Sequence, residues 1–175
     1  MQKTSLETPL GLTIIEGDEN GVKRISVTGG SPVDPDDLPI DNPMASEKKE
    51  LPPSEVPKEL QEAVLQLKEY FSGSRTHFSF KIAPEGTEFQ KRVWEQLLKI
   101  PFGTTVSYLD LSKELGDIKA IRAVASANGK NPLWIVVPCH RVIGSDGSLT
   151  GYAGGLWRKK WLLEHENPSN QTSLF

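Results

Sequence analysis

Cys139 and His140 are adjacent in the chain, and together they offer a nucleophile and a base. Cys139 is the only cysteine, and a thiol attacks carbon as the thiolate. Because an ordinary cysteine with a pKa of about 8.5 is mostly protonated at neutral pH, a nucleophilic Cys139 needs a base, and the base needs a group that orients it. His140 is the candidate base, and Glu164 and Glu166 are the candidate orienting carboxylates.

The position of Cys139 also fits a purely structural role. The apolar residues 134–137 (WIVV) predict a short buried strand, and a lone cysteine after such a strand is most often a small buried hydrophobic residue. Adjacent side chains of a strand face opposite ways, so direct contact between Cys139 and His140 requires a turn at Pro138 or a bridging water. Residue types alone therefore leave both roles open.

The second half of the chain is predicted to be mostly helical, since its apolar residues recur at helical spacing between capping residues. Two short helices across a tight glycine-containing turn are typical of a helix-turn-helix. The predicted elements are a helix capped by Thr87 and ended by Pro101, a helix capped by Ser107 that ends at Gly116, a small-residue-rich helix over residues 118–129, the 134–137 strand, a turn at 144–147 and a helix over 156–165.

The first half is predicted to be a small α/β unit, so we divide the chain into domains at residues 1–85 and 86–175. Seven prolines and many acidic residues at 31–57 indicate a long irregular loop rather than a packed element. The predicted elements are strands near 12–16 and 22–27 joined by a turn at Asn20 and Gly21, a helix capped by Ser54 with Pro57 in its first turn and Gly73 at its end, and a strand from His77.

Composition limits the class of protein. The chain has 175 residues, of which 37% are hydrophobic and 25% are charged, as in an ordinary globular protein. No apolar run approaches the roughly 20 residues that span a bilayer, and no signal-peptide pattern follows Met1. One cysteine excludes an internal disulfide and a thiolate zinc cluster. We expect an intracellular, cytoplasmic protein with no membrane partner and no metal.

Charge is unevenly distributed along the chain, whose net charge is −3. Residues 1–85 hold 9 Lys and Arg against 15 Asp and Glu, whereas residues 86–175 hold 11 against 8. The basic second half is therefore the part expected to meet an anionic partner.

Three blocks of the second half carry a resemblance to a known family: FQKRVWEQLLKIPFGTTVSY, IRAVASANGKNP and VVPCHRVIGSDGSLTGYAGGLWRKKWLLEHE. Together, from Thr87 to Glu166, they resemble the O6-alkylguanine-DNA alkyltransferases (methylated-DNA–protein-cysteine methyltransferases), and PCHRV resembles the signature around the alkyl acceptor. The resemblance implies an α+β fold, with a small N-terminal domain on an antiparallel sheet and a mostly helical C-terminal domain. It also implies DNA repair in which the cysteine takes and keeps the alkyl group of an O6-alkylguanine.

The resemblance assigns roles to individual residues. Cys139 would accept the alkyl group, His140 would act as base through a water, and Glu166 would orient His140. For the other site residues it implies that Asn131 positions the cysteine loop, Tyr108 protonates the departing guanine, Arg122 replaces the flipped base in the stack, Tyr152, Ala153 and Gly154 form the substrate pocket, and Ala120, Ala123, Ser126 and Arg141 contact DNA in the minor groove. Many relatives have serine where this chain has Ala153.

The expected partner is double-stranded DNA that contains O6-alkylguanine, and no cofactor is expected. We expect a monomer, with cooperative binding along DNA and activity on O4-alkylthymine as open alternatives. Three other functions compete: a damage sensor, against which Cys139 argues; a cysteine hydrolase, for which no oxyanion-hole motif is evident; and a transcriptional regulator, whose cysteine-rich metal module is missing from this chain.

Overall fold

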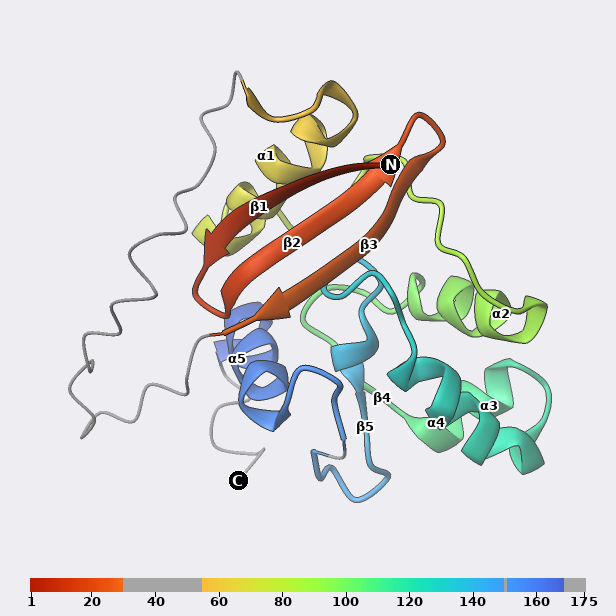
Figure 1. The fold of residues 1–175 in the computed structure, drawn as a ribbon. Coiled ribbons are helices and arrows are strands. Elements are labelled where there is room, and N and C mark those ends of the chain that lie inside the picture. Colours follow the sequence, from red (N-terminus) through yellow and green to blue (C-terminus); the bar gives the residue numbers. More distant parts are fainter. Residues whose placement is uncertain (30–54, 150, 169–175) are drawn as a thin grey trace.

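The computed structural model describes residues 1–29, 55–149 and 151–168. The expected acidic loop falls outside these ranges for residues 31–54, and so does the expected Ser54 cap. An N-terminal three-stranded sheet with one helix is followed by a mostly helical part, as the sequence predicted (Figure 1).

The N-terminal sheet is antiparallel, with the strands side by side in chain order. The last two strands were predicted; the first was missed because its sequence is mostly polar and turns only Thr4 and Leu6 fully inward. The hairpin turn is held by the Asn20 backbone amide, which donates to Asp18 Oδ1 at 2.8 Å. The strands are β1 (Gln2–Thr8), β2 (Gly11–Asp18) and β3 (Gly21–Thr28).

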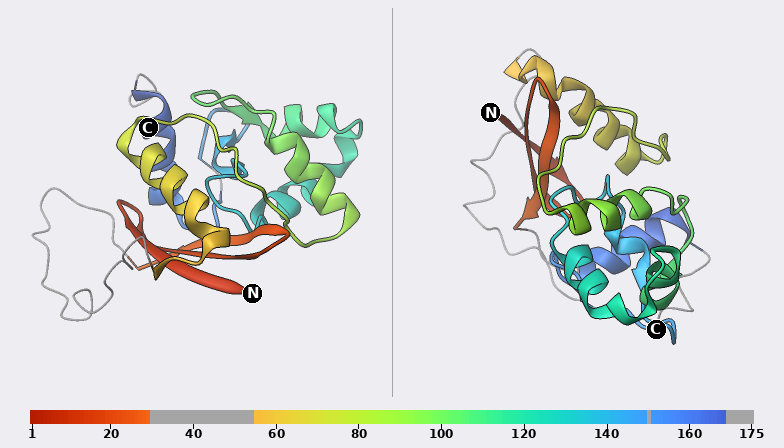
Figure 2. Two further views of the ribbon diagram at one scale, coloured as in Figure 1. Left: turned by 90° about the horizontal axis from the view of Figure 1, so that it is seen from above. Right: turned by 90° about the vertical axis from the view of Figure 1, so that its right-hand side faces the viewer.

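Helix α1 (Lys58–Ser72) covers one face of this sheet (Figure 2). It begins after Pro57, which is the N-cap residue rather than a first-turn residue, and it ends at Gly73 in the left-handed conformation, with a φ of 87°. Its buried face includes Leu60, Leu67 and Tyr70, which recur at helical spacing.

The strand predicted from His77 is wrong. The segment makes only an isolated bridge between Ile82 and Val22. The backbone amide of Ser79 instead donates to the side chain of Gln66 at 2.8 Å, so a contact with α1 replaces strand pairing.

The first two helices of the second half begin where the sequence predicted, whereas the helix predicted over residues 118–129 begins at Ile121. Thr87 and Gln90 form a capping box at the start of α2, and Ser107 caps α3. Trp94 ties α2 to α4, because its Nε1 donates to the Ala127 carbonyl at 2.9 Å. The helices are α2 (Glu88–Leu97), α3 (Tyr108–Glu114) and α4 (Ile121–Gly129), with a 3₁₀ turn at Ile118–Ala120 before α4. Helices α3 and α4 form the predicted helix-turn-helix, with Gly116 at a φ of 87° between them.

Residues 134–137 form a turn, so the predicted strand is wrong. Ile135 has a φ of 75°, and among the described residues it is the only non-glycine residue with a positive φ. A β-branched residue in this region costs on the order of 1–3 kcal/mol, and such strain persists only where the surroundings impose it. The turn delivers the chain to a 3₁₀ turn at Cys139–Arg141.

The two halves of the sequence join through backbone hydrogen bonds. The Ile25 amide of β3 donates to the Pro132 carbonyl at 2.8 Å, and the Trp134 amide donates back to the Ile25 carbonyl at 3.1 Å. Helix α5 (Leu156–Glu166) packs beside the 3₁₀ turn, and two short strands, β4 (Val106–Ser107) and β5 (Val142–Ile143), pair in parallel. Of the helices described, none is both long and apolar enough to cross a membrane.

Candidate active site

Cys139 lies in the wall of a cavity of about 530 Å³ between the helix-turn-helix and the loop before α5. Only 4% of the residue is exposed. The cavity is lined by Tyr108, Ile121, Arg122, Ala125, Asn128, Gly129, Asn131, Trp134, Cys139, Gly151, Tyr152 and Ala153. One thiol therefore faces a pocket large enough for a small planar ligand.

Burial raises the pKa of the Cys139 thiol to about 11, while a hydrogen bond with the Asn131 side chain and the charge of Lys159 oppose that effect without cancelling it. The thiol is therefore protonated at neutral pH. Its reactivity depends on a group that can take the proton as the new bond forms.

Asn131 fixes the turn that precedes Cys139. Its Nδ2 donates to the Val137 carbonyl at 2.7 Å, and its Oδ1 accepts from the Leu133 amide at 2.9 Å. The residue is 3% exposed, so these bonds are shielded from water. Asn131 thus holds the turn that contains Ile135 and precedes Cys139.

His140 is fully buried and pairs with Glu166, the second of the two candidate carboxylates. Its Nε2 lies 2.8 Å from Glu166 Oε2. Since an ionised carboxylate only accepts, we assign the imidazole proton to Nε2, which leaves Nδ1 as the basic nitrogen. Nδ1 has no hydrogen-bond partner among the described residues, so it is available to accept a proton. Glu164 instead forms a partly exposed ion pair with Lys160 at 4.0 Å.

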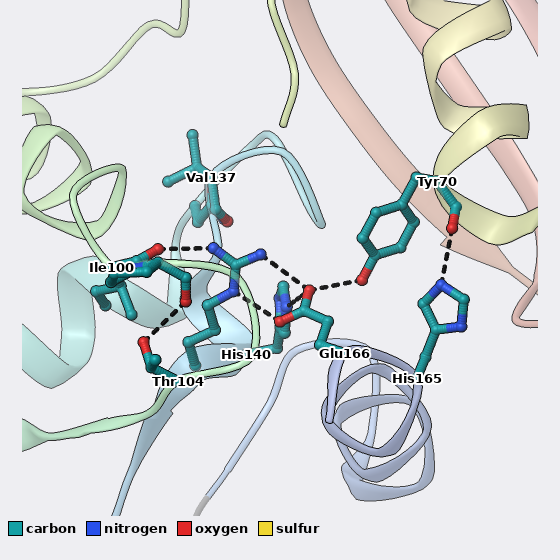
Figure 3. Close-up of polar contacts among 10 residues, drawn as sticks. Tyr70, Ile100, Thr104, Val137, His140, His165 and Glu166 are labelled. Carbon is teal, nitrogen blue, oxygen red and sulfur yellow. Dashed lines mark hydrogen bonds and ion pairs between the residues drawn. The ribbon is translucent and has the colours of Figure 1, made fainter. Parts of the chain in front are cut away.

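Glu166 accepts hydrogen bonds from three side chains (Figure 3). Besides His140, Arg141 donates through Nε at 2.7 Å and through Nη2 at 3.0 Å, and the Tyr70 hydroxyl donates at 2.6 Å. Burial alone would raise the pKa of the Glu166 carboxyl, but His140 and Arg141 together hold it well below its usual range. The carboxylate is therefore charged at neutral pH.

The prediction that Arg141 contacts DNA is corrected by the structure. Arg141 is 7% exposed, and besides its two bonds to Glu166 it donates from Nη1 to the Ile100 carbonyl at 2.7 Å. Its guanidinium is oriented into the protein and neutralises Glu166 there. It holds the Glu166 carboxylate rather than a phosphate.

The predicted pocket and DNA-contacting residues lie at the cavity or on the neighbouring helix. Tyr108, Tyr152 and Ala153 line the cavity, and Arg122 lies on its wall with an exposed side chain. Gly154 is buried behind it: a Cβ there would approach Tyr152 Cε1 to 2.9 Å and Trp134 Cζ3 to 3.0 Å. Of the remaining predicted DNA contacts, Ala123 and Ser126 are exposed on α4, whereas Ala120 is half-buried at its start.

Sequence reasoning missed two residues of the site, Tyr70 and Lys159. Lys159 has no exposed surface, and its Nζ lies 5.9 Å from the Tyr108 ring centroid. Burial lowers the pKa of Lys159 to about 8, and the neighbouring Cys139 partly opposes the shift. Its spacing from Leu162, Leu163 and Glu166 places it on the buried face of α5, which is a signal the sequence did contain.

The segment that forms the site is similar in sequence to proteins of a known family. Residues 88–168 match the family described as 6-O-methylguanine DNA methyltransferase, DNA binding domain. The methylated-DNA–protein-cysteine methyltransferase of Methanosarcina acetivorans is 45% identical over 162 residues, which are 91% of this chain and 94% of that protein. The constitutive methylated-DNA–protein-cysteine methyltransferase of Bacillus subtilis is 44% identical over 167 residues, or 95% of each chain.

The fold is also similar to solved structures. The crystal structure of Mycobacterium tuberculosis OGT in complex with DNA matches with a TM-score of 0.76 at 34% sequence identity, over 99% of this chain and 95% of that one.

Proposed function

This chain belongs to the methylated-DNA–protein-cysteine methyltransferase family, and from that premise we propose how its residues carry out the reaction. The activity is that of an O6-methylguanine-DNA methyltransferase, a DNA repair protein that binds DNA. We propose Cys139 as the methyl acceptor. The observation that carries this assignment is the position of the only cysteine on the cavity wall, next in sequence to a buried His140–Glu166 pair.

The proposed step is an in-line displacement at the methyl carbon. The Cys139 sulfur forms the new S–C bond while the C–O6 bond of guanine breaks, so sulfur, carbon and oxygen must be aligned within the pocket. The thiol proton passes through one water to His140, whose charge Glu166 then stabilises. Tyr108 donates a proton to the guanine ring, which would otherwise leave as an anion.

Reaching Cys139 requires the damaged base to leave the duplex. A base inside the stack cannot enter a protein cavity, and extruding it costs a few kcal/mol. Arg122 lies on the cavity wall, and its long cationic side chain can fill the gap in the stack. The small exposed residues Ala123 and Ser126 let α4 lie close to the minor groove, which carries little sequence information and so suits a protein that repairs any sequence.

The protein should act once per molecule. A thioether is a very poor leaving group, so methylated Cys139 is not regenerated by the reverse reaction. We further propose double-stranded DNA carrying O6-alkylguanine as the partner, a monomer as the acting form, an intracellular location, and domains at residues 1–85 and 86–175. The mass-spectrometric assay described next, repeated with duplex DNA bearing O4-alkylthymine, tests whether the pocket also accepts that lesion.

Intact mass spectrometry after mixing the protein with duplex DNA bearing one O6-methylguanine tests the proposal. We expect a gain of one methyl group per molecule, and no gain for Cys139→Ala under the same conditions. Tight binding to the lesion without any mass gain would instead make the protein a damage sensor. Neither gain nor binding would leave Cys139 as a buried structural residue.

A further inference from the structure

Tyr70 belongs to α1, yet its hydroxyl ends inside the site formed by the second half of the chain (Figure 3). It donates to Glu166 Oε2 at 2.6 Å, across a sequence separation of 96 residues. We propose that Tyr70 is a positioning residue for methyl transfer, through which the N-terminal part of the protein holds Glu166 and His140 in the reactive arrangement. The proposal rests on the function proposed above and adds to it a residue from outside the resembling segment.

The geometry at Glu166 gives Tyr70 a specific task. Oε2 accepts from Tyr70, from His140 Nε2 at 2.8 Å and from Arg141 Nη2 at 3.0 Å, whereas Oε1 accepts only from Arg141 Nε among the described residues. Arginine alone prefers a symmetric fork on a carboxylate. The Tyr70 hydroxyl adds a second short bond on the His140 side, which fixes the rotation of the carboxylate toward the imidazole.

Packing alone does not explain a tyrosine at this position. The ring is fully buried, with Phe71 at 5.2 Å and Phe78 at 5.4 Å between ring centroids, so a phenylalanine would satisfy the same neighbours. Burying a hydroxyl costs free energy unless it finds a partner, and here the partner is a charged carboxylate. Burial and then the charge of Glu166 raise the pKa of Tyr70 well above its usual value, so the hydroxyl stays protonated and remains a donor.

The backbone of the same residue strengthens the connection between the two parts of the chain. His165, the neighbour of Glu166 in α5, makes a 2.7 Å hydrogen bond from Nε2 to the Tyr70 carbonyl, and its ring lies 5.0 Å from the Tyr70 ring. Both ends of Tyr70 therefore contact the last turn of α5. A displacement of α1 would move the carboxylate on which His140 depends.

Tyr70→Phe tests the proposal, since it removes one oxygen and keeps the ring. The rate of methyl transfer at saturating lesion DNA should fall about 10- to 100-fold, as expected for the loss of one hydrogen bond to a charged group. The groups that face Glu166 are Tyr70, His140 and Arg141, with His165 adjacent. Without the hydrogen bond from Tyr70, the negative charge of Glu166 acts more strongly on His140 and stabilises the imidazolium. The acidic limb of the pH–rate profile should therefore move to higher pH.

Gln66→Met is the matched control. Gln66 is buried on the same helix, one turn earlier, and its hydrogen bonds go to Glu62 and Ser79 rather than to Glu166. This variant should lose stability while keeping the wild-type rate and pH profile. Equal slowing of both variants with no shift of the profile, or a Tyr70→Phe protein with wild-type kinetics, would overturn the proposal.

NMR spectra of the His140 imidazole separate this proposal from the proposed function. The imidazole signals should shift in Tyr70→Phe and stay unchanged in Gln66→Met, whether or not the protein transfers a methyl group. A wild-type protein that gains no methyl group contradicts the function; an unshifted His140 contradicts the role of Tyr70 alone.

Discussion

At the scale of single residues, the Cys139 thiol is not activated in advance and depends on a base such as His140. Burial raises the pKa of the thiol to about 11, so the free protein holds no appreciable thiolate at neutral pH. The chemistry therefore depends on proton removal during attack rather than on a standing thiolate. A protected, protonated thiol also explains how a protein that is consumed by one reaction avoids reacting with other electrophiles first.

Replacing His140 by Gln should slow methyl transfer at pH 7.5 by about 10²- to 10⁴-fold, the usual contribution of a positioned base. Below a thiol pKa of about 11, the remaining rate should rise about tenfold for each pH unit, because only thiolate formed without help can attack. Single-turnover assays on lesion duplex between about pH 7 and 10 measure both effects. A variant rate that stays level across this range would show that His140 is not the base.

Glu166→Gln should change how stability depends on pH. The pKa of Glu166 is depressed in the folded protein, so its carboxylate stabilises the fold above the ordinary value of 4.5 and that contribution is lost as the pH falls below it. The variant should be less stable at pH 7, by about 3 kcal/mol, because Arg141 loses its counter-ion. Urea unfolding at a series of pH values should show a flatter acid dependence for the variant. Parallel curves for the two proteins would contradict this account of Glu166.

Sequence and structure contribute differently at this scale. Cys139, His140 and Glu166 could be singled out from the family resemblance, which runs continuously from Thr87 to Glu166. The contribution of Tyr70 was not predictable, because Tyr70 lies 96 residues before Glu166 and the sequence does not show where its hydroxyl group lies. The expected DNA contact at Arg141 failed for a related reason: a basic residue beside a site gives no sign of whether it faces phosphate or a buried carboxylate.

At the scale of elements, the sequence predicted helix starts correctly where the stabilising contact lies within one turn of the chain. Thr87 and Ser107 cap their helices as predicted, because a cap is a contact within one turn. The two predicted strands that failed, at 134–137 and from His77, are set by hydrogen bonds between a side chain and the backbone, which hydrophobic patterning does not report. Asn131 bends the first into a turn, and Gln66 binds the backbone of the second.

Helix α4 is the element proposed to meet DNA, and Ala123→Glu tests it. Ala123 is exposed on α4, so the substitution adds a negative charge without disturbing the core. The Kd for duplex DNA should rise about tenfold at low salt, and the difference from wild type should shrink as salt is added. Fluorescence anisotropy at two salt concentrations measures this, with Leu65→Glu, at an exposed position of α1, as the control of equal charge. If both variants lose affinity equally, net charge rather than α4 governs binding.

At the scale of the whole molecule, residues of both halves, 1–85 and 86–175, contribute to one continuous hydrophobic core. The sheet shares backbone hydrogen bonds with residues after α4 through Ile25, and Tyr70 reaches α5. Arg158 adds a third connection, since its guanidinium donates to the Leu10 carbonyl at 3.0 Å and also to the Gly29 and Gly154 carbonyls. The acidic first half thus stabilises the basic half that is expected to approach DNA.

These connections predict that the chain unfolds as one unit, which Ile15→Ala can test. Ile15 has no exposed surface in the centre of the sheet, so its truncation should cost about 2–5 kcal/mol. All four tryptophans lie after residue 86, so their fluorescence reports mainly the second half, whereas far-ultraviolet circular dichroism reports both halves. The two unfolding midpoints should coincide and fall together in the variant, while Leu65→Ala, at a half-exposed position, should leave both unchanged. A tryptophan transition that keeps its wild-type midpoint in Ile15→Ala would show that the halves fold independently. In that case the N-terminal part could not hold Glu166 and His140 in place through Tyr70.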